Sequence, residues 1–212
     1  MGGVDILVND AAYNKWIPFQ DLDSLTLDEW QKMLAINLTG PMIGIKATAP
    51  VMRRHGQGRI VKISSVAGLY PGGSSIPYAV SKAAADMFID TLVQNFDFPA
   101  TLIRSTNVYG RHQQLFKIIP RTAIYLKLGK PVELHGGGLS SKCFVHVRDV
   151  VDGLLAAFEQ GKTGTFHFSV PSDITIAEIV RIVCEEMGQS FEDNTAVVGE
   201  RLGQDARYVL DC

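Results

Sequence analysis

The chain has 212 residues, with 20 Lys and Arg against 22 Asp and Glu and a formal net charge of −2. This balance argues against nucleic acid or an anionic membrane as a partner, and no apolar run reaches the roughly 18 residues of a membrane span. The three cysteines, Cys143, Cys184 and Cys212, have no metal-ligand spacing, so we expect reduced thiols in a cytoplasmic protein without a metal site.

The N-terminal third predicts one strand and two helices. The strand, Val4 to Val8, begins close to the first residue. The first helix, Thr26 to Asn37, has Thr26 as N-cap and Glu29 three residues on, which is the spacing of a capping box. The second helix, Met42 to Arg54, ends in cations, which favour a helix C-terminus.

The stretch from Arg59 to Lys82 predicts a strand, a Gly- and Pro-rich loop and a helix. Tyr78 and Lys82 are four residues apart, hence on one face of that helix. A free tyrosine has a pKa of about 10, and a neighbouring cation favours the phenolate and lowers that pKa. The pair is therefore a candidate for moving a proton to or from an alcohol or carbonyl. A bare Tyr and Lys at this spacing also occur in ordinary helices.

The next predicted strand is Ala100 to Ser105, so the order of elements is β-α-β-α-β. Such alternation favours a parallel sheet covered by helices. The prediction is an α/β, Rossmann-like parallel sheet flanked by helices.

Two further residues place Tyr78 and Lys82 in a family context. Ser65 precedes Tyr78 by thirteen residues at a strand end, and Asn37 lies in the segment INLTG. Here the chain resembles the compact branch of the short-chain dehydrogenase/reductase superfamily, whose catalytic tetrad is Asn, Ser, Tyr and Lys. The resemblance implies that Tyr78 is the general acid or base and that Ser65 holds the substrate oxygen. Lys82 would lower the tyrosine pKa and bind the nicotinamide ribose, and Asn37 would support a water relay.

The segment after the first strand, Asn9-Asp10-Ala11-Ala12, resembles the superfamily's NNAG segment, with Asp10 and Ala12 as departures. The resemblance implies that Asn9 and Ala11, together with Tyr78 and Lys82, line a pocket for NAD or NADP.

The later part of the chain resembles a different branch. RSTNVYG (104–110), GKPVELHGGG (129–138), KCFVHVRDVVDGLLAAFE (142–159) and ERLGQDARYVLD (200–211) follow the order of the extended, sugar-nucleotide-modifying epimerases and dehydratases. The resemblance implies that Asn107, Lys142 and Arg201 contact a nucleotide sugar. It divides the chain into a partial Rossmann-like catalytic domain, residues 1–110, and a mainly sugar-nucleotide-binding region, residues 111–212, and it implies that the latter is a smaller α+β substrate domain.

A complete member opens with a strand, a Gly-rich turn and a helix that binds the dinucleotide, and this unit is not found here. We therefore expect the sheet to lack its first three strands and the C-terminus to be truncated as well. A natural hybrid, an engineered chimera and an in-frame deletion all stay open. The strand Val4 to Val8 would then be an unpaired edge, so we expect self-association there or through the two helices flanking the sheet.

Two hypotheses about function follow. In the dehydratases the loop after the central strand carries an Asp-Glu pair, whereas SSVAGLYPGG has no carboxylate. The first hypothesis is an NAD(P)-dependent oxidoreductase or epimerase-type enzyme acting on a nucleotide sugar. The alternative is a catalytically silent binding or assembly subunit that has lost cofactor binding or needs a partner chain to supply it.

Overall fold

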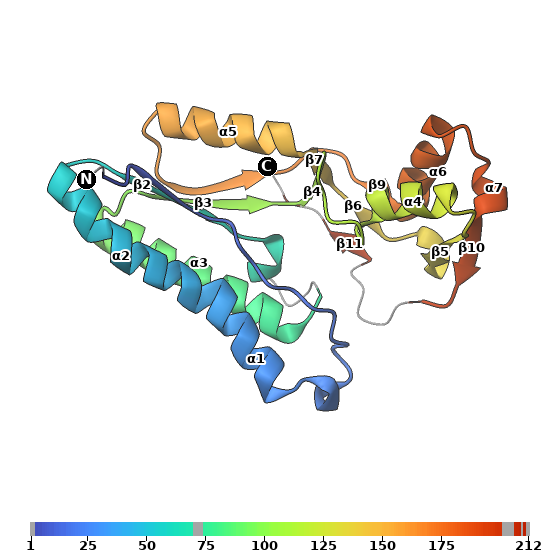
Figure 1. The fold of residues 1–212 in the computed structure, drawn as a ribbon, viewed down its shortest axis with the longest axis horizontal. Coiled ribbons are helices and arrows are strands. Elements are labelled where there is room, and N and C mark those ends of the chain that lie inside the picture. Colours follow the sequence, from blue (N-terminus) through green and yellow to red (C-terminus); the bar gives the residue numbers. More distant parts are fainter. Residues whose placement is uncertain (1–2, 70–73, 201–205, 209, 211–212) are drawn as a thin grey trace. The chain divides into compact units, whose positions relative to one another are not determined.

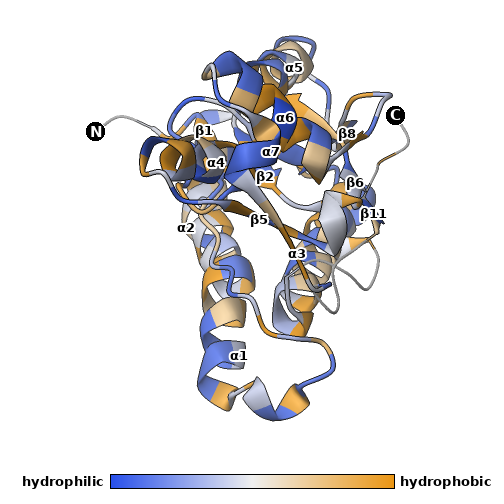
Figure 2. Cartoon of the chain, turned by 90° about the vertical axis from the view of Figure 1, so that its right-hand side faces the viewer, coloured by the Kyte–Doolittle hydropathy of each residue, from blue (hydrophilic) through white to orange (hydrophobic). Residues whose placement is uncertain are grey.

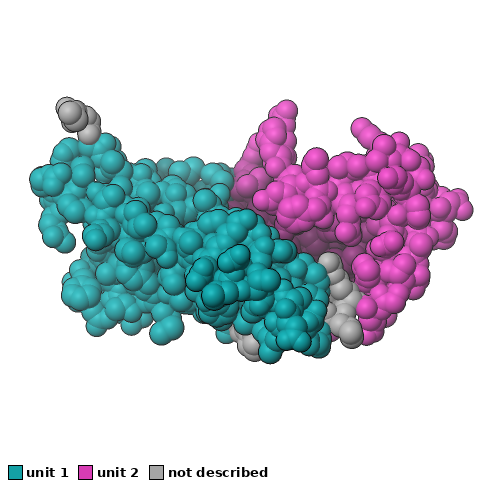
Figure 3. Space-filling model, turned by 60° about the horizontal axis from the view of Figure 1, so that its bottom comes forward, with its two compact units in different colours: residues 1–105, 151–168 teal, residues 106–150, 169–212 magenta. Residues whose placement is uncertain are grey.

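The computed structural model describes residues 3–69, 74–200, 206–208 and 210. The chain forms two compact units, coloured separately in Figure 3. The first contains residues 1–105 and 151–168, and the second contains residues 106–150 and 169–212.

The first unit is built on a four-stranded sheet in which every pair is parallel. Its order is β1 (Ile6–Asn9), β2 (Arg59–Ile63), β3 (Ala100–Ser105) and β8 (Gly164–Phe168). The strands are mostly apolar and buried in the centre of the sheet, as expected for a parallel sheet covered on both faces. The predicted Rossmann-like sheet is confirmed, and β1 is the edge strand of its described part.

Helices α2 (Gly40–His55) and α3 (Ile76–Phe96) lie on one face of this sheet, and α5 (Val147–Glu159) lies on the other (Figure 1). The core between the sheet and the α2/α3 layer contains Ile45, Met52, Ile60, Ile89, Ala100 and Leu102. In Figure 2 the helices α1 and α3 carry bands of both colours, and α3 buries polar side chains, Ser81, Lys82 and Asp86, beside apolar ones.

The first predicted helix starts where expected. The Thr26 hydroxyl accepts a hydrogen bond from Glu29 N at 3.2 Å and caps α1 (Leu27–Leu34). The Glu29 side chain does not complete a capping box, because it bonds instead to Lys15 and to the Tyr13 hydroxyl.

The gap predicted between the first two helices is absent. A π-helical turn, Ala35–Thr39, joins α1 to α2, so the two run as one long element in Figure 1. Such wide turns are frequently found at functional sites. Gly56, with φ of 71°, then ends α2 as an αL cap.

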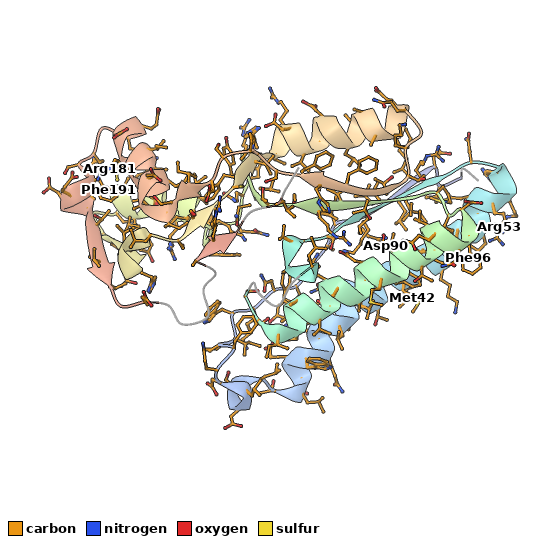
Figure 4. The ribbon with its side chains drawn as sticks, turned by 180° about the vertical axis from the view of Figure 1, so that it is seen from behind. Met42, Arg53, Asp90, Phe96, Arg181 and Phe191 are labelled. Atoms are coloured by element: carbon orange, nitrogen blue, oxygen red, sulfur yellow. The ribbon has the colours of Figure 1, made fainter. Side chains whose placement is uncertain are left out.

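The second unit combines helices with short paired strands. Its helices are α4 (Ile118–Lys127), α6 (Ile176–Glu186) and α7 (Phe191–Asn194), and its strand pairs are β5 (Val132–His135) with β10 (Thr195–Val198), β4 (Asn107–Tyr109) with β7 (Phe144–His146), and β6 (Ser141–Lys142) with both β9 (Ile174–Thr175) and β11 (Arg207–Tyr208). Its core contains Leu126, Val132, Leu134, Val180 and Cys184. Arg181 lies 4.0 Å from the ring centre of Phe191 and connects α6 to α7 (Figure 4).

The division into units differs from the predicted domains, which are continuous segments. The second part of α5 and strand β8 return to the first unit, because β8 pairs with β3 along five residues. In the part of the chain that the structure describes, every helix is too short or too polar to cross a membrane.

Candidate active site

Ser65, Tyr78 and Lys82 converge at the carboxyl end of β2. Ser65 follows the strand and caps a 3₁₀ turn, Val66–Gly68, by accepting a hydrogen bond from Ala67 N at 3.2 Å. Tyr78 lies in the first turn of α3, where Pro77 is tolerated because the first helical N–H groups need no intrahelical partner. The carboxyl end of a parallel strand is where α/β proteins bind ligands.

The Tyr78 phenol lies in a desolvated position. Burial raises the pKa of Tyr78 above its usual value, a hydrogen bond with the Ser65 hydroxyl partly opposes this rise, and the charge of Asp86 adds to it. The phenol is therefore protonated at neutral pH, and it shares a hydrogen bond with the serine predicted to hold the substrate oxygen.

Lys82 lies one turn further along α3. Its Nζ is 5.7 Å from the centre of the Tyr78 ring and donates a hydrogen bond to the Ile63 carbonyl oxygen at 3.3 Å. Burial, together with the nearby Lys62, lowers the pKa of Lys82 to about 7. The sequence predicted that Lys82 lowers the Tyr78 pKa. In the structure burial outweighs any such effect, and Lys82 itself is only partly charged at neutral pH.

Asn37 is fully buried in the π-helical turn, and its side chain organises the surrounding backbone. Its Nδ2 donates to Tyr13 O at 2.8 Å and to Ser81 Oγ at 2.9 Å, and its Oδ1 accepts from Tyr13 N at 2.7 Å. Ser81 Oγ in turn donates to the Tyr78 carbonyl oxygen at 2.8 Å. Asn37 is therefore tied both to the segment after β1 and to the first turns of α3.

Asn9 and Ala11, the predicted cofactor residues, lie at and just after the carboxyl end of β1. The Asn9 Nδ2 atom is buried and has no hydrogen-bond partner among the described residues. Such an orphaned donor needs a partner, so it fits a site for a polar ligand group. Ala11 is exposed.

Two charged residues that the sequence did not single out are buried in the same place. Lys62 in β2 is 0% exposed, and its Nζ donates to Ile63 O at 2.8 Å. Asp86, one turn beyond Lys82 on α3, pairs with Arg104 Nε at 2.8 Å. A lysine within a β-branched, buried strand was the available signal for Lys62, and the four-residue spacing from Lys82 was the signal for Asp86.

The loop after β2 packs closely on α3 at Gly68. A Cβ atom added at Gly68 would stand 3.2 Å from Ala83 N, from Asp86 Oδ2 and from the Lys82 carbonyl carbon. Glycine is the residue that allows this approach, which holds the Ser65 turn against the helix carrying Tyr78 and Lys82.

The predicted substrate residues belong to the second unit. Asn107 bonds to the Cys143 carbonyl oxygen through its backbone N–H at 3.1 Å and its Nδ2 at 3.2 Å. Lys142 lies in β6. Arg201 is outside the residues that the structure describes. Over the described segments, no group of three or more His, Cys, Asp or Glu is arranged to hold a metal ion.

These elements and this site define a Rossmann-like α/β protein with a serine, a tyrosine and a lysine at the end of a central strand. Comparison with protein families gives two matches: short chain dehydrogenase over residues 1–107, and GDP-mannose 4,6 dehydratase over residues 62–209. The chain belongs to the short-chain dehydrogenase/reductase superfamily, and the predicted resemblance of its two halves to different branches is confirmed.

Similar proteins come from both branches. dTDP-D-glucose 4,6-dehydratase of Homo sapiens is 33% identical over 140 residues, which cover 63% of this chain and 40% of the human protein. The granaticin polyketide synthase putative ketoacyl reductase 2 of Streptomyces violaceoruber is 44% identical over 80 residues, covering 38% of this chain and 32% of that protein.

Solved structures show the same fold. DesIV, a dTDP-glucose 4,6-dehydratase from Streptomyces venezuelae with NAD bound, is 25% identical with a TM-score of 0.75, and the match covers 98% of this chain and 65% of DesIV. The chain thus spans 40% of the length of the human dehydratase and about two thirds of DesIV.

Proposed function

We propose that this chain carries the catalytic residues of an NAD(P)-dependent oxidoreductase or epimerase-type enzyme acting on a nucleotide sugar, with Tyr78 as general acid or base. The observation that carries the proposal is the arrangement of Ser65, Tyr78 and Lys82 at the end of β2. Relatives of Homo sapiens and Haemophilus influenzae are named as dTDP-glucose 4,6-dehydratases, and this supports a nucleotide sugar as the substrate class.

The geometry supports a division of work within the site. Tyr78 holds a proton at neutral pH because burial raises its pKa, so it is prepared to donate to a carbonyl oxygen that is being reduced. The Ser65 hydroxyl, already bonded to the phenol, is the second group for the same oxygen. In the reverse direction the alcohol proton returns to Tyr78.

The loop between β2 and α3 limits which reactions the site can catalyse. Between Ser64 and Ser75 the sequence SSVAGLYPGGSS contains no Asp or Glu. Expulsion of water from a sugar needs a general acid, and valine and alanine cannot serve as one. We therefore propose simple oxidation and reduction or epimerase-like chemistry in place of 4,6-dehydration.

The residues for the nicotinamide end of the cofactor fit a polar ligand. Asn9 offers a buried amide donor without a partner among the described residues, Lys82 offers an amino group beside Tyr78, and Ala11 is exposed. A nicotinamide bound there would supply the hydride acceptor or donor. The Gly-rich diphosphate-binding turn is not found in the sequence, so binding is conditional on how the remainder of the cofactor is held.

Because cofactor binding is conditional, the alternative function is that of a catalytically silent subunit. The outer edge of β1 is the observation that favours this alternative. No strand within the described residues pairs with the outer edge of β1, which is where the nucleotide-binding unit of a complete member would continue. Such a chain would keep Tyr78 and Lys82 as a scaffold and bind no nicotinamide unless a partner supplied the missing strands.

Titration with NADH or NADPH, followed by nicotinamide fluorescence, distinguishes the two functions. Saturable binding at micromolar concentration by the purified chain would exclude the silent subunit, whereas no binding up to millimolar concentration would exclude the isolated enzyme. In the enzyme, Tyr78→Phe is expected to abolish turnover and leave binding nearly unchanged. Loss of binding in this variant would make the tyrosine structural.

The edge of β1 also supports self-association. Ile6 and Val8 are 48% and 52% exposed on one face of the strand, and an unpaired apolar edge is open to pairing with another chain. We propose a homo-oligomer that pairs through this edge. Ile6→Lys with Val8→Lys is expected to give a monomer in sedimentation velocity, and a wild-type chain that is monodisperse and monomeric at micromolar concentration would contradict the proposal.

Cys143 and Cys184 are buried free thiols, in keeping with the cytoplasmic location predicted.

A further inference from the structure

Two lysine side chains meet at one carbonyl oxygen beneath the candidate active site. Lys62 Nζ lies 2.8 Å and Lys82 Nζ 3.3 Å from Ile63 O, so the two nitrogens are within about 6 Å of each other. Lys62 is 0% exposed and Lys82 is 2% exposed. Lys82 belongs to α3 and Lys62 to β2, so the two side chains reach this oxygen from different elements. Lys62 points towards the layer that contains α3.

The surroundings offer little negative charge to two buried ammonium groups. Neither lysine forms a salt bridge with a described residue. Asp86 is the buried carboxylate next to them, and its ion pair is with Arg104. Asp10, beyond the end of β1, adds a weaker attraction. Two like charges at this distance in a desolvated site favour loss of a proton from one of them.

We propose that Lys62 is a positioning residue for Lys82, and that the two side chains carry one positive charge between them at neutral pH. One of the two nitrogens around Ile63 O is then an ammonium and the other a neutral amine, whose titrating proton has been released to solvent. The carboxylates that act on the pair are Asp10 and Asp86. Arg104 pairs with Asp86, and the Tyr78 ring lies beside Lys82.

The burial of both lysines and their mutual repulsion lower the pKa of each, and the pKa of Lys82 falls to about 7. Lys82 therefore switches between ammonium and amine in a pH range in which most lysine side chains stay charged. The charge beside Tyr78 is consequently present below about pH 7 and declines above it. The catalytic meaning of this change rests on the proposed function, but the shared charge itself does not.

The test is a titration of the Lys82 side chain by NMR in protein labelled with ¹³C at lysine Cε. We expect one lysine resonance with a midpoint near pH 7, absent from Lys82→Met. In Lys62→Met we expect the Lys82 midpoint to rise by at least about one pH unit, a tenfold change in its acid dissociation constant. Lys46→Met, which removes an exposed lysine of α2, is the matched control and should leave the midpoint in place.

Two further variants protect the test against a failure of Lys62→Met to fold. Lys62→Gln removes the charge with a shorter polar side chain and should raise the midpoint as well, while Asp86→Asn removes the attraction and should lower it. A Lys82 midpoint above about pH 9.5 in the wild type would overturn the proposal. An unchanged midpoint in a folded variant of Lys62 would do the same.

The outcome is separable from that of the proposed function. The titration needs no cofactor, so a chain that binds no NADH can still show the shared charge. Conversely, NADH binding with a Lys82 midpoint above pH 9.5 would retain the enzyme and exclude the lysine pair. If turnover is observed, its decline at high pH should shift upward in Lys62→Met by the same amount as the NMR midpoint.

Discussion

The side-chain amide of Asn37 forms a reciprocal pair of hydrogen bonds with the backbone of Tyr13. Nδ2 donates to the Tyr13 carbonyl oxygen at 2.8 Å, and the Tyr13 N–H donates to Oδ1 at 2.7 Å. The amide thus pairs with the backbone N–H and C=O of one residue in the loop that follows β1, as a neighbouring strand would. Since Nδ2 also donates to Ser81 Oγ, one side chain connects three separate segments of the first unit.

Replacing Asn37 with alanine is therefore expected to destabilise the fold. The substitution leaves the Tyr13 N–H and C=O in a part-buried site without their partner and removes one of the two hydrogen bonds of the Ser81 hydroxyl, at a cost of about 2–4 kcal/mol. Urea denaturation of the two proteins measures the difference. Asn95→Ala is the matched control, because the Asn95 amide bonds only to Thr91 O at an exposed helix end. Equal losses in the two variants would contradict this account of Asn37.

The low pKa of Lys82 predicts how stability changes with pH. Between about pH 7 and 10.5 the unfolded chain protonates this lysine and the folded chain does not, so the unfolded state binds more protons and stability rises with pH. The expected slope for one lysine approaches about 1.4 kcal/mol per pH unit. The free energy of unfolding at pH 7 and pH 9 should rise more in the wild type than in Lys82→Met. Parallel pH dependences would rule this out.

Gly68→Ala is expected to separate the turn after β2 from α3. The added Cβ would stand 3.2 Å from two backbone atoms, so either the turn or the helix has to shift by a few tenths of an ångström. Such overpacking costs about 1–3 kcal/mol. Gly199→Ala, which meets nothing within 4 Å, should change stability by less than about 0.5 kcal/mol. Thermal or urea unfolding compares them, and a neutral Gly68→Ala would refute the close packing.

Breaking the ion pair between Asp86 and Arg104 should cost far more than breaking a surface pair. Burial raises the pKa of Asp86, and the Ser64 hydroxyl and Arg104 oppose that rise. Arg104→Met leaves a buried carboxylate unpaired, which is expected to cost about 3–5 kcal/mol. Asp90, which lies 3.5 Å from Arg104 Nη2, loses the same cation, but it is more exposed and adds less to the cost.

The control for that pair is Arg181→Ala, which breaks the exposed contact with Glu192 and should cost under about 1 kcal/mol. The double variant Arg104→Met with Asp86→Leu removes both charges and should recover much of the lost stability. If the double variant is as unstable as Arg104→Met, the cost does not come from an unpaired carboxylate.

Much of the first unit could be predicted from its sequence because local patterns and tertiary packing agree there. The strands β1, β2 and β3, the N-cap at Thr26 and the helix that carries Tyr78 all follow from patterns of a few residues. The return of β8 to β3 could not be predicted, because pairing between strands some sixty residues apart has no local signal in a single sequence. The π-helical turn was missed for a related reason: the segment AINLT has no local signal for it, and the partners of Asn37 in the turn, Tyr13 and Ser81, lie in other segments.

Of the predicted site residues, the structure brings Ser65, Tyr78 and Lys82 together at the end of β2, and the sequence did not predict their electrostatics. Spacing along a helix places Tyr78 and Lys82 on one face, but a pKa depends on burial and on neighbours from other strands. Lys62 lies twenty residues from Lys82 in the chain and meets it only because β2 and α3 pack together. The prediction that Lys82 lowers the Tyr78 pKa therefore leaves out Lys62, the neighbouring group that most lowers the pKa of Lys82 itself.

The π-helical turn has a consequence for how this protein tolerates changes in length. A π-helical turn holds one more residue than the α-helical turn it replaces, and its wider hydrogen bonds absorb that residue. Removing one residue from Ala35–Thr39 would therefore let α-helical bonds run from α1 into α2 with little rotation of one helix against the other. The direction of the side chains within the turn would change, so Asn37 would lose its bonds to Tyr13 and Ser81. A one-residue deletion is thus expected to leave both helices in place and still break the link between the segment after β1 and α3.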